Sequence, residues 1–500
     1  MAIEQYSMAT RAVGAGAWTV GTRLATKLVD LAMLLCLARF LGPAEFGLVA
    51  MAMAAVFIVE ALFELPMAAA LIRIPTLTPA LLHTAFTLSL LRGILIALLL
   101  LAVSLPLAAF NDEPRLKALL AVLAFAPALR GLISPRMVEF SRAFNFRPDA
   151  VIELSGKAAA FGVSVLIAVT THSYWAIAAV TVCGPLVSTL MSYYVAPLRP
   201  RLTLVHWAYF SNLIGWNFLS QLFMALSWQI DRIILPRFTP TAEFGQYAMS
   251  KQLAEIPFQA LIAPLARPVM AALASTGNSK GSRYVQLAHA IALVMVPVMG
   301  LPLVWPEVLV HLALGPAWLP AVEWLRWLAA AALLGLPAVL LGPLAMTLDR
   351  PHWVAVRTFI ELVVRLPLVW VGAAQYGVQG AIAGSAISSV IGGLTSLFIV
   401  KKLASISVGA QLKTLITPFV ALTPAAAVLY FSLDTVTASA NSFEFVAFGL
   451  FFGIVYVLTY MLFAALAWWF VGLPPGLERH CWQILLRYKS FFTSRLNLEK

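Results

Sequence analysis

The chain has 500 residues, of which 62% are hydrophobic and only 11% are charged, and its mean hydropathy is +0.92. Soluble domains carry about 25% charged residues, so this composition excludes a soluble globular protein and predicts an all-α polytopic membrane protein. The formal net charge is +12. In a membrane protein the distribution of Lys and Arg between loops carries more meaning than their total, and we expect no nucleic-acid partner.

The three cysteines, Cys36, Cys183 and Cys481, are scattered along the chain. Their positions provide neither a disulfide framework nor a metal-ligand spacing, so we expect no metal and no cofactor. Residues 1–30 lack the uninterrupted apolar core and the cleavage pattern of a secretory signal, and we expect this segment to be retained.

Apolar segments between turn or charge clusters predict about fourteen transmembrane helices, because about 20 apolar residues cross a bilayer. The expected spans are 12–38, 46–72, 80–108, 116–133, 151–170, 173–196, 207–235, 246–272, 285–304, 321–347, 358–375, 380–400, 414–433 and 444–470. We expect four regions: an N-lobe at 1–198 with six spans, a C-lobe at 199–402 with six spans, two accessory spans at 403–471, and a basic cytoplasmic tail at 472–500.

The first expected span carries Arg23, Lys27 and Asp30, whose spacings of four and three place them on one helical face. Ionisable groups inside a membrane cost at least ~2.5 kcal/mol each on insertion scales, so they normally face a bundle interior or a wet cavity. We therefore expect these residues to line a substrate cavity. The alternative is that Arg23 and Lys27 reach the cytoplasmic interface and that Asp30 neutralises one of them.

The turn after this span reads ARFLGPAEFG at 38–47 and returns as PRFTPTAEFG at 236–245. Equivalent residues lie 198 positions apart, and identities at this offset extend from Trp18 to Pro66. Six spans separate the copies, and this even number predicts parallel repeats related by an axis along the membrane normal. The alternative is a recurring helix-turn-helix edge without common ancestry.

Within each copy, proline is expected to end the first helix of the pair and glutamate to begin the next. Pro43 and Pro240 are the breakers, and Glu45 and Glu243 complement the positive N-terminal end of the following helix.

The second expected span places Glu60 and Glu64 four residues apart, and the eighth carries Glu255 with Gln259 at the same spacing. Carboxylates in apolar surroundings suit proton binding and release, so these residues are candidates for coupling transport to a proton or sodium gradient. The alternative is that they are static partners of Arg23, Lys27 or Arg92.

The seventh expected span is the repeat partner of the first and is also polar along one face, with Asn217, Gln221 and Asp231, and Arg232 beside them. Two symmetry-related polar helices imply a hydrated cleft between two six-helix lobes. Further along, Trp305, Trp318, Trp324 and Trp327 predict an aromatic belt at the outer interface. In the eleventh span, Glu361 and Arg365 are spaced to form an ion pair.

Loop charge predicts the orientation. With a cytoplasmic N-terminus, the inner loops carry fourteen Lys or Arg residues between Arg73 and Lys413, whereas the outer loops carry little beyond Arg39, Arg115, Lys117 and Arg237. This asymmetry places both chain ends in the cytoplasm.

Three stretches carry a family resemblance: LARFLGPAEFGLVAMA at 37–52, MVEFSRAFNFRPDAVIELSG at 137–156 and LALGPAWLPAVEWLRWLAAAALL at 312–334. Over about residues 12–402 the chain resembles the polysaccharide-transporter (Wzx-like, WzxC-type) branch of the multidrug/oligosaccharidyl-lipid/polysaccharide exporter superfamily. The resemblance implies two six-helix lobes around a cationic cavity, two further C-terminal helices, and no catalytic residue.

The resemblance also implies a function. It is the flipping of undecaprenyl-pyrophosphate-linked oligosaccharide repeat units across the inner membrane for exopolysaccharide or lipopolysaccharide assembly. Polysaccharide polymerase and glycosyltransferase machinery are the implied partners.

Two other classes of function are compatible with parts of the sequence. A lipid II or drug exporter of the same superfamily is one alternative, although twelve spans would be typical of the drug exporters. A membrane glycosyltransferase or polysaccharide polymerase is another. Such enzymes commonly need acidic or basic residues on a substantial outer loop, and the acidic outer cluster NDEPRLK at 111–117 is short.

Overall fold

The computed structural model describes residues 18, 21–22, 25–65, 67–74, 76–143, 145–211, 215–274, 280–438 and 442–470. The described residues form helices joined by short turns, with no strand among them. The predicted all-α class is therefore confirmed for this part of the chain. The helices divide into two compact units, the first comprising 1–249 with 369–381 and the second comprising 250–368 with 382–500.

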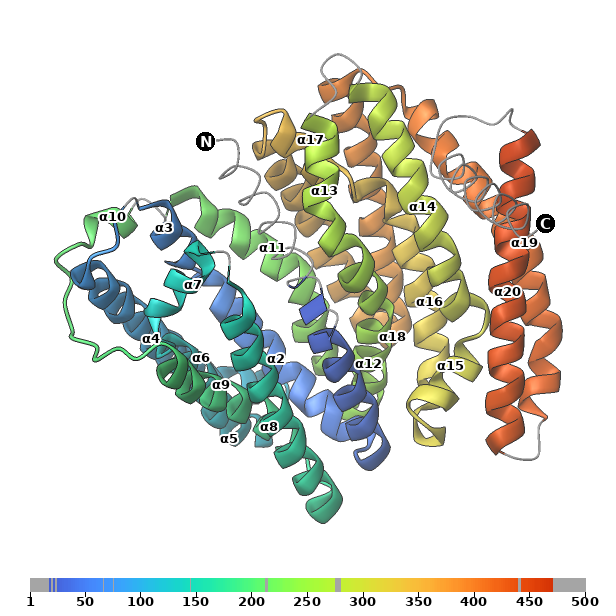
Figure 1. Ribbon diagram of the computed structural model, residues 1–500. Helices are drawn as coiled ribbons and strands as arrows, with labels where there is room; N and C mark the ends of the chain where they lie inside the picture. Colours follow the sequence, from blue (N-terminus) through green and yellow to red (C-terminus); the bar gives the residue numbers. More distant parts are fainter. Residues whose placement is uncertain are drawn as a thin grey trace, which may run out of the picture. The chain divides into compact units, whose positions relative to one another are not determined.

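The first unit begins with a helix at residues 25–40. It continues with α2 (Pro43–Leu62), α3 (Met67–Arg73), α4 (Pro79–Phe110), α5 (Arg115–Leu123), α6 (Phe125–Gly131), α7 (Val138–Arg142), α8 (Arg147–Thr171), α9 (Trp175–Val195), α10 (Ala208–Ser211), α11 (Gly215–Ile234) and the start of α12 (Thr241–Pro257). In this unit α8 and α9 lie side by side as a pair joined by a short turn (Figure 1).

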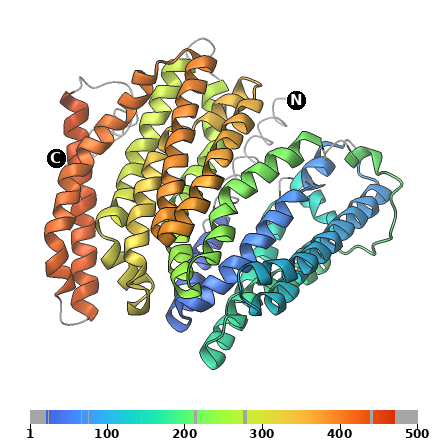
Figure 2. The ribbon, with the colours of Figure 1, turned by 180° about the vertical axis from the view of Figure 1, so that it is seen from behind.

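The second unit contains the end of α12, a π-helical turn at Phe258–Ile262, α13 (Ala263–Ala274), α14 (Lys280–Val304), α15 (Pro306–Ala313), α16 (Ala321–Leu334), α17 (Leu341–Thr347), most of α18 (His352–Ala404), α19 (Val408–Thr437) and α20 (Ser442–Phe470). The last two helices lie side by side in both views (Figures 1 and 2). The buried core of this unit draws its largest shares from α14, α19 and α20.

Nine of the described helices are long and apolar enough to cross a membrane, and the number rises to eleven if each of two bent helix pairs is one span. The first pair, Arg115–Gly131 with Pro135–Arg142, bends by 51°, and the second, Ala321–Leu334 with Leu336–Thr347, bends by 42°. The expected count of fourteen stays a prediction, because the expected span 12–38 lies partly outside the described residues.

Helix α18 extends over 53 residues and consists of two helices joined at a sharp break. Tyr376 and Gly377 leave the helical conformation there, and Gly377 has a positive φ of 56°. The backbones at Gly372 and Gly380 approach so closely that a side chain on either glycine would overlap the other's carbonyl oxygen. Such contact across eight residues requires the two arms to fold back on each other, so α18 is a helical hairpin. That its arms are the two membrane spans expected at 358–375 and 380–400 stays a prediction.

The repeated phrase has the expected structure in both copies. Helix α2 begins at Pro43 with Glu45 in its first turn, and α12 begins at Thr241 with Glu243 in its first turn. A carboxylate at this position stabilises the positive end of the helix dipole. The proline breaks and acidic helix starts that the sequence predicted are thus present.

The two copies of the phrase also contact each other. A Cβ atom on Gly47 would overlap the carbonyl oxygen of Thr241, and a Cβ atom on Gly245 would overlap the carbonyl oxygen of Pro43. Since Thr241 lies 198 positions after Pro43 and Gly245 lies 198 positions after Gly47, each copy makes the same contact with the other. Reciprocal contact of this kind is the geometry of a two-fold axis.

Prolines inside α14 and α19 free backbone carbonyl groups, and neighbouring helices satisfy these groups. Pro297 has no N–H, so it cannot donate to the carbonyl of Leu293, and the hydroxyl of Tyr460 on α20 donates to that oxygen at 3.0 Å. Pro418 likewise frees the carbonyl of Thr414, which lies 3.0 Å from the Nδ1 of His289 on α14. These bonds hold α14, α19 and α20 together at fixed heights.

The predicted aromatic belt is wrong for three of its four tryptophans. Trp305, Trp318 and Trp324 are only 2%, 0% and 8% exposed, whereas Trp327 is 57% exposed. The chain around α15 and the turn at Pro316–Trp318 packs the first two indoles into the protein core, so they cannot face the membrane interface.

Candidate functional site

The polar face of the first helix meets a lysine from α8. Asp30 forms an ion pair with Lys157, whose ammonium also lies 3.4 Å from the carbonyl oxygen of Thr26. Lys27 lies 4.0 Å from the other carboxylate oxygen of Asp30, and its side chain is 55% exposed. Asp30 is therefore engaged by α8, which leaves most of the Lys27 ammonium accessible to an anion.

The sequence did not single out Lys157 as a partner, because it lies 127 positions from Asp30. It is nevertheless an isolated lysine inside an apolar span, and this unusual position was the available signal. Arg23, which we predicted on the same face, lies outside the described residues.

The predicted polar face of α11 is described only in part. The side chains of Asn217 and Gln221 lie outside the described residues. Asp231 is fully buried and accepts a hydrogen bond from the hydroxyl of Tyr247 on α12. Arg232 is half-buried and donates to the side-chain oxygen of Gln229 at 3.4 Å.

The candidate coupling carboxylates have different surroundings. Glu60 pairs with Arg130 of α6, with nitrogen-to-oxygen distances of 3.1 and 3.3 Å. Glu64 is exposed just beyond the end of α2. Glu255, in the second unit, is half-buried on α12 one turn after Lys251, which is only 7% exposed.

A cavity of about 450 Å³ lies beside Glu60 in the first unit. Its polar lining consists of Glu60, Ser89, Arg92 and Arg130, which come from α2, α4 and α6. A cavity of this size can hold a small polar group such as a phosphate. We had predicted Arg92 only as a possible partner of the glutamates and Arg130 only as a loop charge.

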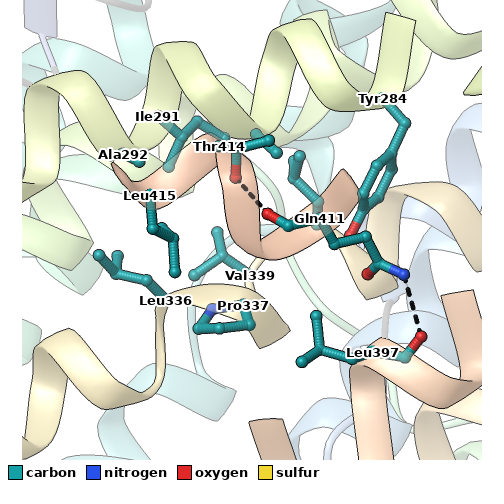
Figure 3. Close-up of a pocket in the computed structure, with 12 residues that line it drawn as sticks. Tyr284, Ile291, Ala292, Leu336, Pro337, Val339, Leu397, Gln411, Thr414 and Leu415 are labelled. Atoms are coloured by element: carbon teal, nitrogen blue, oxygen red, sulfur yellow. Dashed lines mark hydrogen bonds between the residues drawn. The ribbon is translucent and has the colours of Figure 1, made fainter. Parts of the chain in front are cut away.

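The second unit contains a much smaller cavity (Figure 3), of about 30 Å³. Tyr284 and Gln411 point toward each other across it, and the Gln411 amide nitrogen donates to the carbonyl oxygen of Leu397 at 3.0 Å. This volume holds about one water molecule, so the cavity is too small for a saccharide or a lipid head group.

A second cluster of buried charge lies on α18. Glu361 is 6% exposed and pairs with Arg357 at 2.7 Å and with Arg365 at 3.8 Å. The expected pair with Arg365 is therefore present, but Arg357, one turn earlier, is the nearer partner. Gly392 on the returning arm packs directly on this cluster, since its Cβ would lie 3.1 Å from a Glu361 carboxylate oxygen.

The acidic outer cluster contains a salt bridge beside the exposed carboxyl of Asp112. Arg115 donates two hydrogen bonds of 2.8 Å to Glu113. This bidentate contact holds the pKa of the Glu113 carboxyl below its usual value, so the group is ionised at neutral pH. Within the described residues, no group of three or more His, Cys, Asp or Glu could hold a metal ion.

The helical arrangement is that of a known group of transporters. It superimposes on the inward closed conformation of lipid II flippase MurJ with a TM-score of 0.68 and 15% identity, covering 90% of this chain and 98% of that one. An inward-facing multidrug resistance MATE family transporter of the MOP superfamily matches with a TM-score of 0.57 and 13% identity, covering 79% and 99%. At such identities the likeness shows the fold alone, and it defines a multi-pass membrane protein of this fold.

The sequence then defines the family. The polysaccharide biosynthesis protein family matches residues 36–323, more than half of the chain, and the chain belongs to it. The succinoglycan biosynthesis transport protein ExoT of Rhizobium meliloti (strain 1021) is 25% identical over 263 residues, which are 51% of each chain. The chain thus spans about half the length of the curated relative that it matches. The predicted family resemblance is confirmed.

Proposed function

We propose that this chain is a secondary transporter that flips undecaprenyl-pyrophosphate-linked oligosaccharide repeat units from the cytoplasmic to the periplasmic leaflet. The flipped oligosaccharides would be used for exopolysaccharide or lipopolysaccharide assembly. One observation carries the proposal: a member of the polysaccharide biosynthesis protein family has the fold of a lipid II flippase over 90% of its length. A relative named for transport in succinoglycan biosynthesis supports it.

The proposed layout has two six-helix lobes, 1–198 and 199–402, followed by two accessory helices and a basic tail. The reciprocal contact between Gly47 and Gly245 supports a two-fold relation between the lobes. Alternating access would then exchange an inward and an outward opening around this axis.

In this proposal Arg23 and Lys27 attract the anionic head group. A pyrophosphate brings at least two negative charges, and dehydrating them without cationic partners would cost several kcal/mol per charge. Asn217, Gln221 and Arg232 of α11 are proposed to line the other side of the cavity. Asp231, fully buried and bonded to Tyr247, instead joins α11 to α12. The inside-negative potential favours outward movement by about 2.3 kcal/mol per charge per 100 mV, so the cations chiefly lower the barrier to entry.

We also propose coupling to a proton or sodium gradient through Glu60, Glu64 or Glu255. Replacing the responsible residue with Gln should uncouple flipping from the gradient while membrane insertion stays normal. Gradient-dependent flipping at the wild-type rate by all three Gln variants would make these residues static partners, and the Glu60–Arg130 pair gives that alternative one observed contact.

The proposed location is the inner membrane, with both ends in the cytoplasm and with lipids, polymerase and glycosyltransferases as partners. A lipid II or drug exporter of the same fold is the alternative. An enzyme is disfavoured because Glu113, in the acidic outer cluster, is held ionised by Arg115 and cannot act as a general acid at neutral pH.

The deciding experiment is deletion of the protein, followed by identification of the lipid-linked saccharide that accumulates and of the leaflet that holds it. Accumulation of an oligosaccharide repeat unit on the cytoplasmic leaflet is expected. An unchanged glycolipid pool would contradict the proposal, and accumulation of lipid II would favour the alternative exporter.

A further inference from the structure

Two Arg-Gly pairs meet where α4 crosses α6. Arg92 precedes Gly93 on α4, and Arg130 precedes Gly131 on α6. A Cβ atom on Gly93 would lie 2.9 Å from the carbonyl oxygen of Pro127, and one on Gly131 would overlap the carbonyl oxygen of Ser89. The helices can approach this closely only because both residues are glycines, and the close crossing brings both arginines to one cavity.

The cavity holds more positive than negative charge. Glu60 is the carboxylate in its lining, and it pairs with Arg130. The buried Nε of Arg92 has no hydrogen-bond partner among the described residues. Glu64 is exposed just beyond the end of α2 and does not belong to the lining of this cavity. The lining therefore contains two guanidinium groups and a single carboxylate around a volume of about 450 Å³.

The surroundings of the cavity are apolar. Leu65, Met67 and Ile96 complete much of its lining. On α4 the residues next to Arg92 form an exposed apolar stripe, with Leu91 49%, Leu95 42% and Leu98 58% exposed. In a membrane-spanning helix such a stripe faces hydrocarbon, so an anion that reaches Arg92 can carry an apolar chain with it.

We propose that this cavity binds the phosphate head group of a lipid, with its hydrocarbon chain lying along the exposed leucines of α4. Arg92 and Arg130 donate from their guanidinium groups, and Arg130 does so after exchanging Glu60 for a phosphate oxygen. Guanidinium groups suit this role because they present several fixed donors to phosphate oxygens. Glu60 then competes with the ligand for Arg130 and limits its affinity.

Native mass spectrometry of the purified full-length protein in detergent tests the proposal. The probes are phosphatidylglycerol, undecaprenyl diphosphate, inorganic pyrophosphate and diacylglycerol. The wild-type protein should retain the phosphorylated lipids but not diacylglycerol. Arg92→Gln should weaken retention about tenfold or more, and Glu60→Gln should strengthen it, because removal of the competing carboxylate frees Arg130. Arg115→Gln removes an equal charge from an exposed loop and should change nothing.

Each outcome decides the proposal. Preference for undecaprenyl diphosphate would assign the site to a polyprenyl head group, and preference for phosphatidylglycerol would assign it to a membrane phospholipid; both support lipid phosphate binding. Equal lipid retention by wild type and Arg92→Gln, or weaker retention by Glu60→Gln, would overturn it. Pyrophosphate binding as tight as lipid binding would overturn the lipid assignment. No transport step is measured, so this result is independent of the proposed flipping.

Discussion

At the scale of single residues, the ion pair between Asp30 and Lys157 explains how the charged first helix packs inside an apolar protein. Asp30 is 37% and Lys157 24% exposed, so both are partly desolvated. A partly buried charge is costly when its partner is removed, whereas replacement of both partners by apolar or neutral groups can be nearly neutral. The pair therefore serves to position the first helix on α8 and leaves Lys27 accessible.

A double-mutant cycle tests this pairing. Asp30→Asn and Lys157→Met should each lower the thermal stability of the detergent-purified protein, and the double variant should recover part of the loss. We expect a coupling free energy of about 0.5–1 kcal/mol, small because both groups are partly exposed. Strict additivity of the two single changes would show that the contact carries no stability.

The cations beside the Asp30–Lys157 pair are expected to act in transport. Lys27→Ala should slow flipping at matched protein levels, because it removes the most exposed cation of this cluster. Arg23→Ala together with Lys27→Ala should slow it further, and Arg23→Lys should retain partial function. Normal flipping by the double-alanine protein would place these charges at the membrane interface and outside the substrate path.

At the scale of helices, proline carbonyls determine where α20 docks. The carbonyl of Leu293 cannot accept a bond from Pro297, and in a membrane no water compensates for this loss. The Tyr460 hydroxyl donates to that oxygen, and the neighbouring Tyr456 donates to the carbonyl of Pro297 at 2.7 Å. The accessory helix is thus anchored at a defined height on α14.

Tyr460→Phe should therefore lower the free energy of unfolding by about 1 kcal/mol. In a Pro297→Ala background the same change should cost much less, because residue 297 then donates to Leu293 within the helix. Tyr430→Phe is the matched control, since Tyr430 is 68% exposed. An equal cost of Tyr460→Phe in both backgrounds would disprove the link to the proline.

The crossing of α2 and α12 is the second helix-level prediction. Gly47→Ala and Gly245→Ala each place a methyl group against backbone that cannot move aside, and we expect a loss of about 1–3 kcal/mol or failure to assemble. Gly162→Ala on α8 is the control, because its Cβ would meet nothing within 4 Å. Its helix propensity should even rise slightly. Tolerance of alanine at both crossing glycines would remove the contact as a structural requirement.

The sequence predicted features that depend on neighbouring residues, and it did not predict contacts between residues far apart in the chain. Hydropathy and turn residues predicted the long helices, the break in α18 and the acidic start of α12, because each depends on adjacent residues. The ion-pair partners of Asp30 and Glu60 could not be predicted from the sequence, because Lys157 lies 127 positions from Asp30 and Arg130 lies 70 positions from Glu60. The burial of Trp318 depends on the path of the turn at Pro316–Trp318, which hydropathy does not specify.

At the scale of the whole molecule, the number of membrane crossings determines which loops share a side. We expect the two arms of α18 to be two crossings, because the chain reverses at Tyr376 and Gly377. With this reversal, the loop after α18 is expected on the same side as the loop between α7 and α8, which follows Arg142 at the end of α7. Without it, every residue after α18 would change sides.

Cysteine labelling in intact cells tests this arrangement, after Cys36, Cys183 and Cys481 have been replaced. Ala143→Cys and Ser405→Cys should react only with reagents that reach the cytoplasm, because both lie in loops on the positively charged side. Thr171→Cys and Ala438→Cys, at the ends of α8 and α19, should react with an impermeant reagent added outside. All four positions are exposed, so lack of reaction reports sidedness rather than burial. If Ser405→Cys labels from outside while Ala143→Cys does not, α18 crosses the membrane once. If all four positions are reversed, the loop-charge asymmetry does not set the orientation of this protein.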